Sequence, residues 1–340
     1  MFDKQWLILG PAMILLQAGA QAQSQSTVTM YGVLDAAVAV EDTGDPNSSS
    51  RKAINSGNQS SSRLGFRGTE DLGGGLKAFF NLEAGIGLDT GTAESAFFGR
   101  RSVVGIESTL GTLVLGREYS PLAGVAAASD IFGQGFFGTN LSAFSSGRLT
   151  RRVSNSVSYK TPSFAGLAAS FMASPSEGVA GASKLTGTAL EYRSGRLFAA
   201  GGYHGVSRPG GPDGKEYGMG FGYGLDNMEF KVNYLVADPG TAGRKFQQMN
   251  IGASIAFGKG QLLGNVQTNS LEGGAKGTAL AATYAYELSR RSNLYASYAR
   301  MSNNASAAFA LNSSSTSVAP ATASLGADPS VIALGIRHRF

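Results

Sequence analysis

The sequence contains no cysteine, one tryptophan and few charged residues, and these shortages limit what it can be. Without cysteine it has no disulfide framework. Charged residues make up 15%, and the net charge of +5 comes from basic residues that are scattered singly, which argues against a nucleic-acid-binding surface. The mean hydropathy is −0.03, and no apolar run approaches the ~20 residues that a spanning helix needs. A bundle of transmembrane helices is therefore excluded.

The N-terminus has the pattern of an export signal. The longest apolar run, Trp6 to Leu16, is broken by Pro11 and followed by Ala20-Gln21-Ala22, a small-x-small cleavage site. We therefore expect a signal peptide over residues 1–22 and a mature domain over residues 23–340. The only tryptophan leaves with the signal, so any aromatic girdle has to consist of tyrosine and phenylalanine.

What the sequence does have is a regular alternation of apolar residues with polar or small ones, and the C-terminus shows this alternation most clearly. Ile332, Leu334, Ile336, His338 and Phe340 share one face of an extended segment. The opposite face carries alanine, glycine and two arginines. A strand with lipid on one side and water on the other has this composition.

The same pattern recurs along the chain and predicts sixteen strands. We place them at 27–40, 60–69, 76–87, 96–108, 112–117, 152–160, 166–173, 184–193, 196–204, 215–226, 228–237, 246–257, 260–268, 277–288, 292–301 and 330–340. Short turns rich in Gly, Pro, Asn and Ser alternate with long loops. An even number of strands, joined alternately by short turns and long loops, predicts an all-β protein, a 16-stranded antiparallel transmembrane β-barrel.

Alternation also predicts which side chains face the lumen. In 152–160 it places Val153, Val157 and Tyr159 outward and Arg152 inward. In 60–69 it places Arg63 on the polar face. In 96–108, apolar residues occupy both faces, so alternation does not decide whether Arg100 or Arg101 faces the lumen.

No constellation in the sequence points to catalysis, a metal or a cofactor. The two histidines, His204 and His338, are far apart, and neither has a nearby partner for nucleophilic chemistry. No metal-ligand spacing is present. A G-x-G-x-x-G match at 133–138 lacks the strand–helix context of a dinucleotide site. We expect no catalytic residues, no metal and no cofactor.

Five motifs, taken in order, resemble a known family. They are Val28-Thr29-Met30-Tyr31-Gly32-Val33-Leu34-Asp35, the stretch 60–78 from Ser60 to Ala78, Phe98-Gly99-Arg100-Arg101 with the segment 111–117, Asn155-Ser156-Val157-Ser158-Tyr159-Lys160-Thr161-Pro162, and Gly335-Ile336-Arg337-His338-Arg339-Phe340. Together they are similar to the Gram-negative general diffusion porins of the beta-proteobacterial type. The resemblance extends over nearly the whole mature sequence.

The resemblance implies a homotrimer whose third extracellular loop, here 118–151, folds into the lumen and narrows it. It implies a basic wall of Arg63, Arg100 and Arg152 opposite the loop acids Glu118 and Asp130. It also implies that Phe340 serves as an assembly signal for the outer-membrane assembly machinery, and that the surroundings are outer-membrane lipid and lipopolysaccharide.

The function expected is passive diffusion of small hydrophilic solutes and ions across the outer membrane of a Gram-negative bacterium. Three wall arginines against two loop acids predict a mild preference for anions. Two alternatives remain open: a solute-selective channel with a saturable site, and an outer-membrane barrel enzyme such as a lipase or protease.

Overall fold

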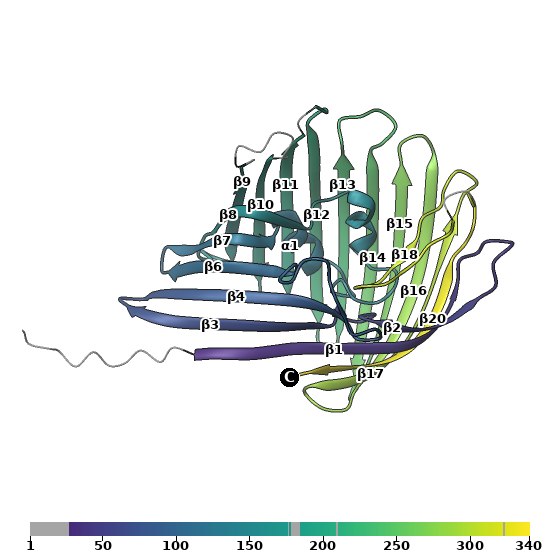
Figure 1. Cartoon of the computed structure of the whole chain (residues 1–340), viewed down its shortest axis with the longest axis horizontal. Coiled ribbons are helices and arrows are strands. Elements are labelled where there is room, and N and C mark those ends of the chain that lie inside the picture. The colour runs from purple at the N-terminus through teal and green to yellow at the C-terminus, as the bar shows by residue number, and fades with distance from the viewer. Residues whose placement is uncertain (1–26, 176, 178–183, 209, 322–323) are drawn as a thin grey trace, which may run out of the picture.

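A computed structural model describes residues 27–175, 177, 184–208, 210–321 and 324–340. Within these residues, sixteen long strands form the wall of a closed antiparallel barrel (Figure 1). They are β1 (Thr27–Asp42), β3 (Arg63–Gly73), β4 (Leu76–Gly87), β6 (Arg101–Ser108), β7 (Gly111–Tyr119), β8 (Arg152–Lys160), β9 (Leu167–Ser174), β10 (Lys184–Ser194), β11 (Leu197–Ser207), β12 (Gly214–Leu225), β13 (Met228–Asp238), β14 (Phe246–Phe257), β15 (Gly260–Leu271), β16 (Ala275–Glu287), β17 (Ser292–Asn303) and β20 (Ser330–Arg339). The predicted signal peptide lies outside the described residues.

The barrel closes through its first strand. One edge of β1 pairs with β20, from Val33 opposite Arg339 to Asp42 opposite Ser330. The other edge pairs first with β3 and then with the short strand β2 (Arg51–Ser56). Closure leaves the wall without a free edge, which the hydrocarbon of a bilayer requires because it offers backbone groups no other partner.

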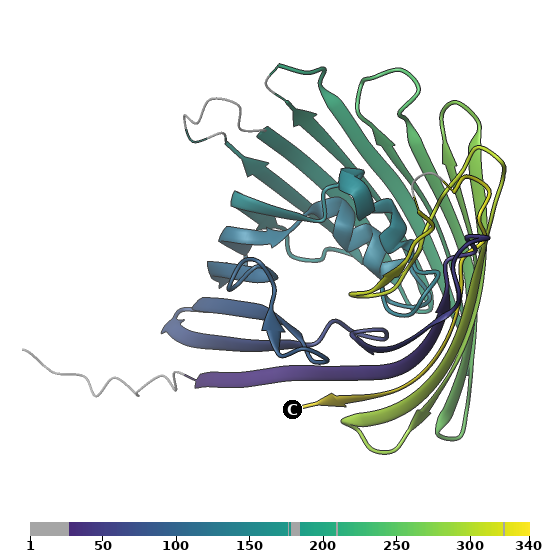
Figure 2. The same ribbon diagram turned by 45° about the vertical axis from the view of Figure 1, so that its right-hand side comes forward.

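Smaller elements belong to the long connections. β5 (Thr92–Ala93) pairs with the end of β4, and β18 (Leu311–Asn312) pairs with β19 (Ser317–Val318). The longest internal connection, 120–151, contains helix α1 (Pro121–Ala128) and two short 3-10 helices, η1 (Asn140–Ala143) and η2 (Ser145–Gly147). Figure 2 shows this connection inside the curve of the wall. None of the helices in the described residues is long and apolar enough to cross a membrane.

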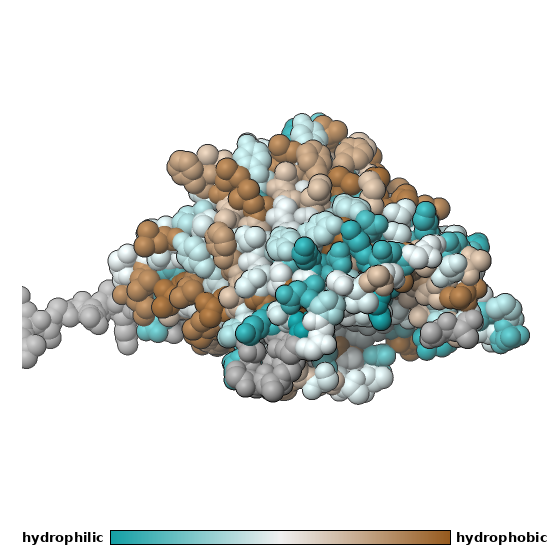
Figure 3. All heavy atoms as spheres, turned by 90° about the horizontal axis from the view of Figure 1, so that it is seen from above, coloured by the Kyte–Doolittle hydropathy of each residue, from teal (hydrophilic) through white to brown (hydrophobic). Residues whose placement is uncertain are grey.

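The wall has two chemically different faces. Outward residues such as Met219, Ile251, Leu280 and Leu334 are exposed and apolar. Inward residues include many buried amides and hydroxyls, among them Asn233. Seen from above, hydrophilic residues gather over the middle of the molecule and hydrophobic ones lie toward its edges (Figure 3). Alternation in the sequence follows from this division, because successive side chains of a strand point to opposite faces.

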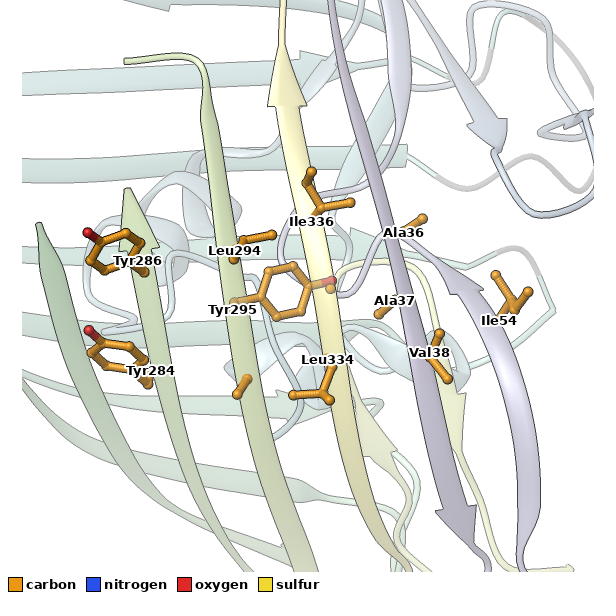
Figure 4. A pocket seen from close by; sticks show the side chains of 12 residues that line it. Ala36, Ala37, Val38, Ile54, Tyr284, Tyr286, Leu294, Tyr295, Leu334 and Ile336 are labelled. Carbon is orange, nitrogen blue, oxygen red and sulfur yellow. The ribbon is translucent and has the colours of Figure 1, made fainter. Parts of the chain in front are cut away.

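The outer face also has an apolar hollow of about 730 Å³ where the last strands meet the first. Tyr284 and Tyr286 of β16, Leu294 of β17, Leu334 and Ile336 of β20 and Val38 of β1 line it (Figure 4). Near the short turns, Tyr223, Phe257, Tyr284 and Tyr286 are exposed, so the aromatic residues at this rim are tyrosine and phenylalanine. The hollow belongs to the lipid-facing surface and not to the lumen.

The structure corrects the predicted facing of Val153. Asn155 has a φ of +54°, and the register between β7 and β8 shifts between Gly116 and Glu118. This bulge reverses the alternation, so Val153 packs inward with Met172, Leu185 and Val206, while Val157 stays on the lipid side. A bulge adds one residue to a strand without a sequence signal that alternation can read.

Candidate functional site

The candidate site is a cavity of about 560 Å³ between the inward connection and the wall formed by the first half of the chain. Its charged lining residues are Arg63, Arg100, Arg101, Arg151, Glu83 and Glu118. Four guanidinium groups against two carboxylates leave this lining with a net charge of +2. Tyr31 and Tyr119 complete the polar lining.

Glu83 of β4 joins two of the predicted arginines. Its Oε1 accepts a hydrogen bond of 2.7 Å from Arg100 Nε, and its Oε2 lies 3.2 Å from Arg63 Nε as an ion pair. Tyr31 Oη donates to the same Oε2 at 3.1 Å. The register of β3 and β4 places Gly65 opposite Glu83, and the missing Cβ of Gly65 leaves room for the Tyr31 ring. One carboxylate therefore partly neutralises two cations.

Tyr119, at the end of β7, joins the third predicted arginine to this group. Its Oη accepts a hydrogen bond of 2.7 Å from Arg152 Nη2 and lies 3.5 Å from Arg100 Nη2. The Arg152 guanidinium lies 4.6 Å from the centre of the Tyr119 ring, a cation–π contact. Arg63, Arg100 and Arg152 thus come together through Glu83 and Tyr119.

Both arginines at the start of β6 face the lumen, which the sequence left open. Arg101 forms an ion pair with Glu118, and Arg100, which precedes the strand, turns to Glu83. Further along β6, Val103 is buried inside while Val104 and Ile106 are exposed to the lipid side. The apolar residues on both faces therefore reflect a buried inner contact as well as a lipid contact.

The two predicted loop acids have other positions than expected. Glu118 lies in β7, because the strand continues two residues beyond its predicted end, so Glu118 is a wall residue. Asp130 is in the loop, but it is 0% exposed. It accepts hydrogen bonds from the amides of Phe132, Gln134 and Asn140 and from the Thr139 hydroxyl. Burial raises the pKa of Asp130, and these donors oppose the rise. Asp130 organises the loop and does not line the cavity.

Arg151, which the sequence analysis did not single out, supplies a cation from the end of the loop. Its Nη2 donates to Gln134 Oε1 at 2.9 Å. Burial lowers the pKa of Arg151 to about 10, and neighbouring Arg152 adds to the effect. The group therefore remains charged at neutral pH. Glu83, Tyr119 and Arg151 were missed because their roles depend on contacts between side chains that are far apart in the sequence.

Glycines and polar side chains of the wall hold the loop in place. Gly202, Gly218 and Gly220 face α1, and a Cβ at any of them would contact the helix or the residue that caps it. Asn233 Nδ2 donates to the Ser129 carbonyl at 2.9 Å, and Asn265 Nδ2 donates to the Gly138 carbonyl at 2.7 Å. The loop therefore rests on the strands of the second half of the chain, opposite the arginines.

The remaining predicted residue, Phe340, lies at the outer face. Its backbone exchanges two hydrogen bonds with Gly32, at 3.1 and 3.2 Å, and its ring covers the position where Gly32 lacks a Cβ. In the described residues there is no group of three or more His, Asp or Glu side chains that could hold a metal ion.

Comparison with known proteins identifies relatives of this barrel. The model of the Gram-negative porin family matches residues 12–306. Outer membrane porin protein 32 of Delftia acidovorans is 31% identical, and the match covers 97% of this chain and 98% of that protein. The anion-selective porin from Comamonas acidovorans superimposes with a TM-score of 0.84 at 28% identity, over 93% of this chain and all of the other. A trimer form of OmpT from Vibrio cholerae has the same fold, with a TM-score of 0.70 at 16% identity over 93% of this chain and 99% of the other.

Proposed function

The chain belongs to the Gram-negative porin family, and we propose that its channel, which passes small hydrophilic solutes by passive diffusion, has a mild preference for anions. It is an outer-membrane protein. The observation that carries the proposal is the net charge of +2 on the cavity beside the loop.

The physical argument for anion preference is local. A solute in the cavity passes close to guanidinium groups, and near the protein wall charges interact more strongly than in bulk solvent. Arg63 and Arg100 share Glu83, and Arg100 also lies 3.7 Å from Glu94. The surplus positive charge comes from Arg151 and Arg152, whose hydrogen-bond partners are the neutral side chains of Gln134 and Tyr119. Mobile ions screen part of this field, which is why the preference is mild. The similarity to a porin described as anion-selective supports the same reading.

We also propose that no enzymatic activity accompanies transport. His204 has both ring nitrogens in hydrogen bonds, to the Leu122 amide and to Glu216, so neither is available as a base for substrate. His338 Nδ1 lies 2.8 Å from Ser292 Oγ on the exposed outer face, away from the cavity. A hydrolytic activity of the purified protein would contradict this part.

The proposed organisation of the chain is a signal peptide over 1–22 and a barrel over 23–340, with a constriction loop that we now begin at Ser120 rather than at Glu118. Intact-mass measurement of the membrane form tests the cleavage, and a mature chain that keeps Trp6 would contradict it. We propose a homotrimer, which family membership supports. Chemical cross-linking and native mass measurement test it, and a single monomeric species in several detergents would contradict it. Lipopolysaccharide and the assembly machinery are the proposed partners in the membrane.

One experiment tests the channel proposal. The protein is inserted into a planar bilayer, and its reversal potential is measured in a salt gradient. A small potential of the sign that indicates anion permeation is expected. A potential of the opposite sign would contradict the proposed preference, and conductance that saturates with one solute would favour the solute-selective alternative.

A further inference from the structure

A buried histidine and glutamate fasten the constriction loop to the wall near both of its ends. His204 of β11 is 0% exposed, and its Nδ1 lies 2.9 Å from Glu216 Oε2 on β12. The amide of Leu122, in the first turn of α1, donates to His204 Nε2 at 3.1 Å. At the other end of the loop, the Thr150 amide and hydroxyl donate to Glu216 at 2.9 and 2.8 Å.

This arrangement fixes the protonation state of the histidine. Nε2 accepts a hydrogen bond from a backbone amide, so it carries no proton while the loop is docked. Nδ1 then carries the proton and donates it to Glu216. A second proton on Nε2 would point at the Leu122 N–H, and the positive end of the helix dipole lies at the same place. Protonation and docking of the first turn of α1 are therefore mutually exclusive.

Glu216 is the titratable group that faces His204 in the structure. On β10 the residue opposite is Gly187, and α1 consists of Pro, Leu, Ala, Gly and Val. The inward residues of β12 beyond Glu216 are glycines. Arg151, next to Thr150, turns away to Gln134. The charge of the His204–Glu216 pair is therefore set by these two side chains and not by a third titratable neighbour.

We propose that His204 and Glu216 form an acid-sensitive latch, which holds the first turn of α1 against the wall when His204 is neutral and releases it when His204 takes up a proton. Ala123 and Gly124 of this turn line the cavity, so release changes the shape of the pore. Because release binds one proton, the equilibrium moves toward release as the pH falls, by at most about tenfold per pH unit. Imidazole is the side chain that changes charge between about pH 5 and 8.

The test uses the absence of cysteine from the chain. Leu122 is buried, whereas Gly124 on the same helix is exposed with no atom close to where its Cβ would lie. Two single-cysteine variants, Leu122→Cys and Gly124→Cys, are each inserted in membranes. They are treated with 4,4′-dithiodipyridine, a thiol reagent that also reacts in acid. The ratio of the two labelling rates cancels the intrinsic effect of pH on the reagent. We expect this ratio to rise as the pH falls from about 7.5 to 4.5.

A second variant assigns the effect to His204. His204→Gln keeps an acceptor for Leu122 and a donor for Glu216 but does not titrate, so the labelling ratio in this background is expected to stay flat. His338→Gln, which changes the histidine on the outer face, is expected to leave the rise unchanged. A flat ratio in the parent protein would overturn the proposal. The same rise in the His204→Gln background would also overturn it, because the titrating group would then be Glu216.

The inference rests on the proposed function in one respect, that the loop borders the conducting path. Single-channel recording separates the two questions. If the protein conducts but the labelling ratio is flat, the latch is wrong and the channel stands. If the ratio rises but the protein does not conduct, the channel is wrong and the latch stands.

Discussion

Replacing Gly220 by alanine should push the constriction loop away from the wall. Gly220 lies on the inward face of β12, directly beneath the C-terminal end of α1. A Cβ at this position would lie less than 3.0 Å from Cβ and Oγ of Ser129, the residue that caps the helix. Carbon atoms in contact stay about 3.5–4.0 Å apart, so the end of the helix has to move by at least roughly 0.5–1 Å. The wall is fixed by hydrogen bonds to both neighbours, so the helix moves toward the lumen.

The expected results are a smaller single-channel conductance and a loss of about 1–3 kcal/mol in the free energy of unfolding, the usual cost of overpacking. Gly224→Ala is the matched control, since Gly224 lies on the same strand and face with nothing within 4 Å of its Cβ position. Both quantities are measured on protein refolded in detergent and inserted in planar bilayers. The double variant Gly220→Ala with Ser129→Gly removes the atoms that clash, and its conductance should return toward that of the parent. Equal effects of Gly220→Ala and Gly224→Ala, or no recovery in the double variant, would refute the packing argument.

Three other predictions concern charge, a buried hydrogen bond and assembly. Replacing Arg63, Arg100 and Arg152 together by glutamate should shift the reversal potential in a salt gradient toward cations. Lys231→Glu, which changes an inward residue that pairs with Glu229, should shift this potential much less. Equal shifts would mean that the diffuse charge of the lumen decides selectivity. Tyr295→Phe removes the 2.7 Å hydrogen bond to the buried carboxylate of Asp35 and should lower the free energy of unfolding, measured by urea titration, by about 1–3 kcal/mol. Tyr298→Phe, which changes a tyrosine on the outer face, should alter this free energy little. Deleting Phe340 should reduce the amount of barrel in the outer membrane more than it lowers the urea midpoint of the barrel that does form; normal membrane levels would contradict the assembly role.

The barrel could be predicted from the sequence because lipid and water impose opposite chemistry on alternate residues. For β14 the predicted bounds and the observed ones agree at both ends. The inner contacts were harder to predict. Val153 was assigned to the wrong face because of the bulge at Asn155, and Glu118 was assigned to the loop because β7 continues past Arg117. Tyr119 and Glu83 bring the arginines together across strands. These contacts could not be predicted, because no local sequence pattern indicates a contact between residues so far apart in the sequence.

The two sides of the cavity are built largely from different parts of the sequence, and this has a consequence for engineering. Most charged wall residues at the cavity precede the loop in the chain, namely Arg63, Glu83, Arg100, Arg101 and Glu118, and Arg151 and Arg152 lie at its end. The residues that carry the loop, His204, Glu216, Asn233 and Asn265, all follow it. Most of the charge of the cavity and the support of the loop are therefore encoded in different parts of one chain. A hybrid that joins the first half of one such protein to the loop and second half of another could exchange most of the charged wall while keeping the dimensions of the passage.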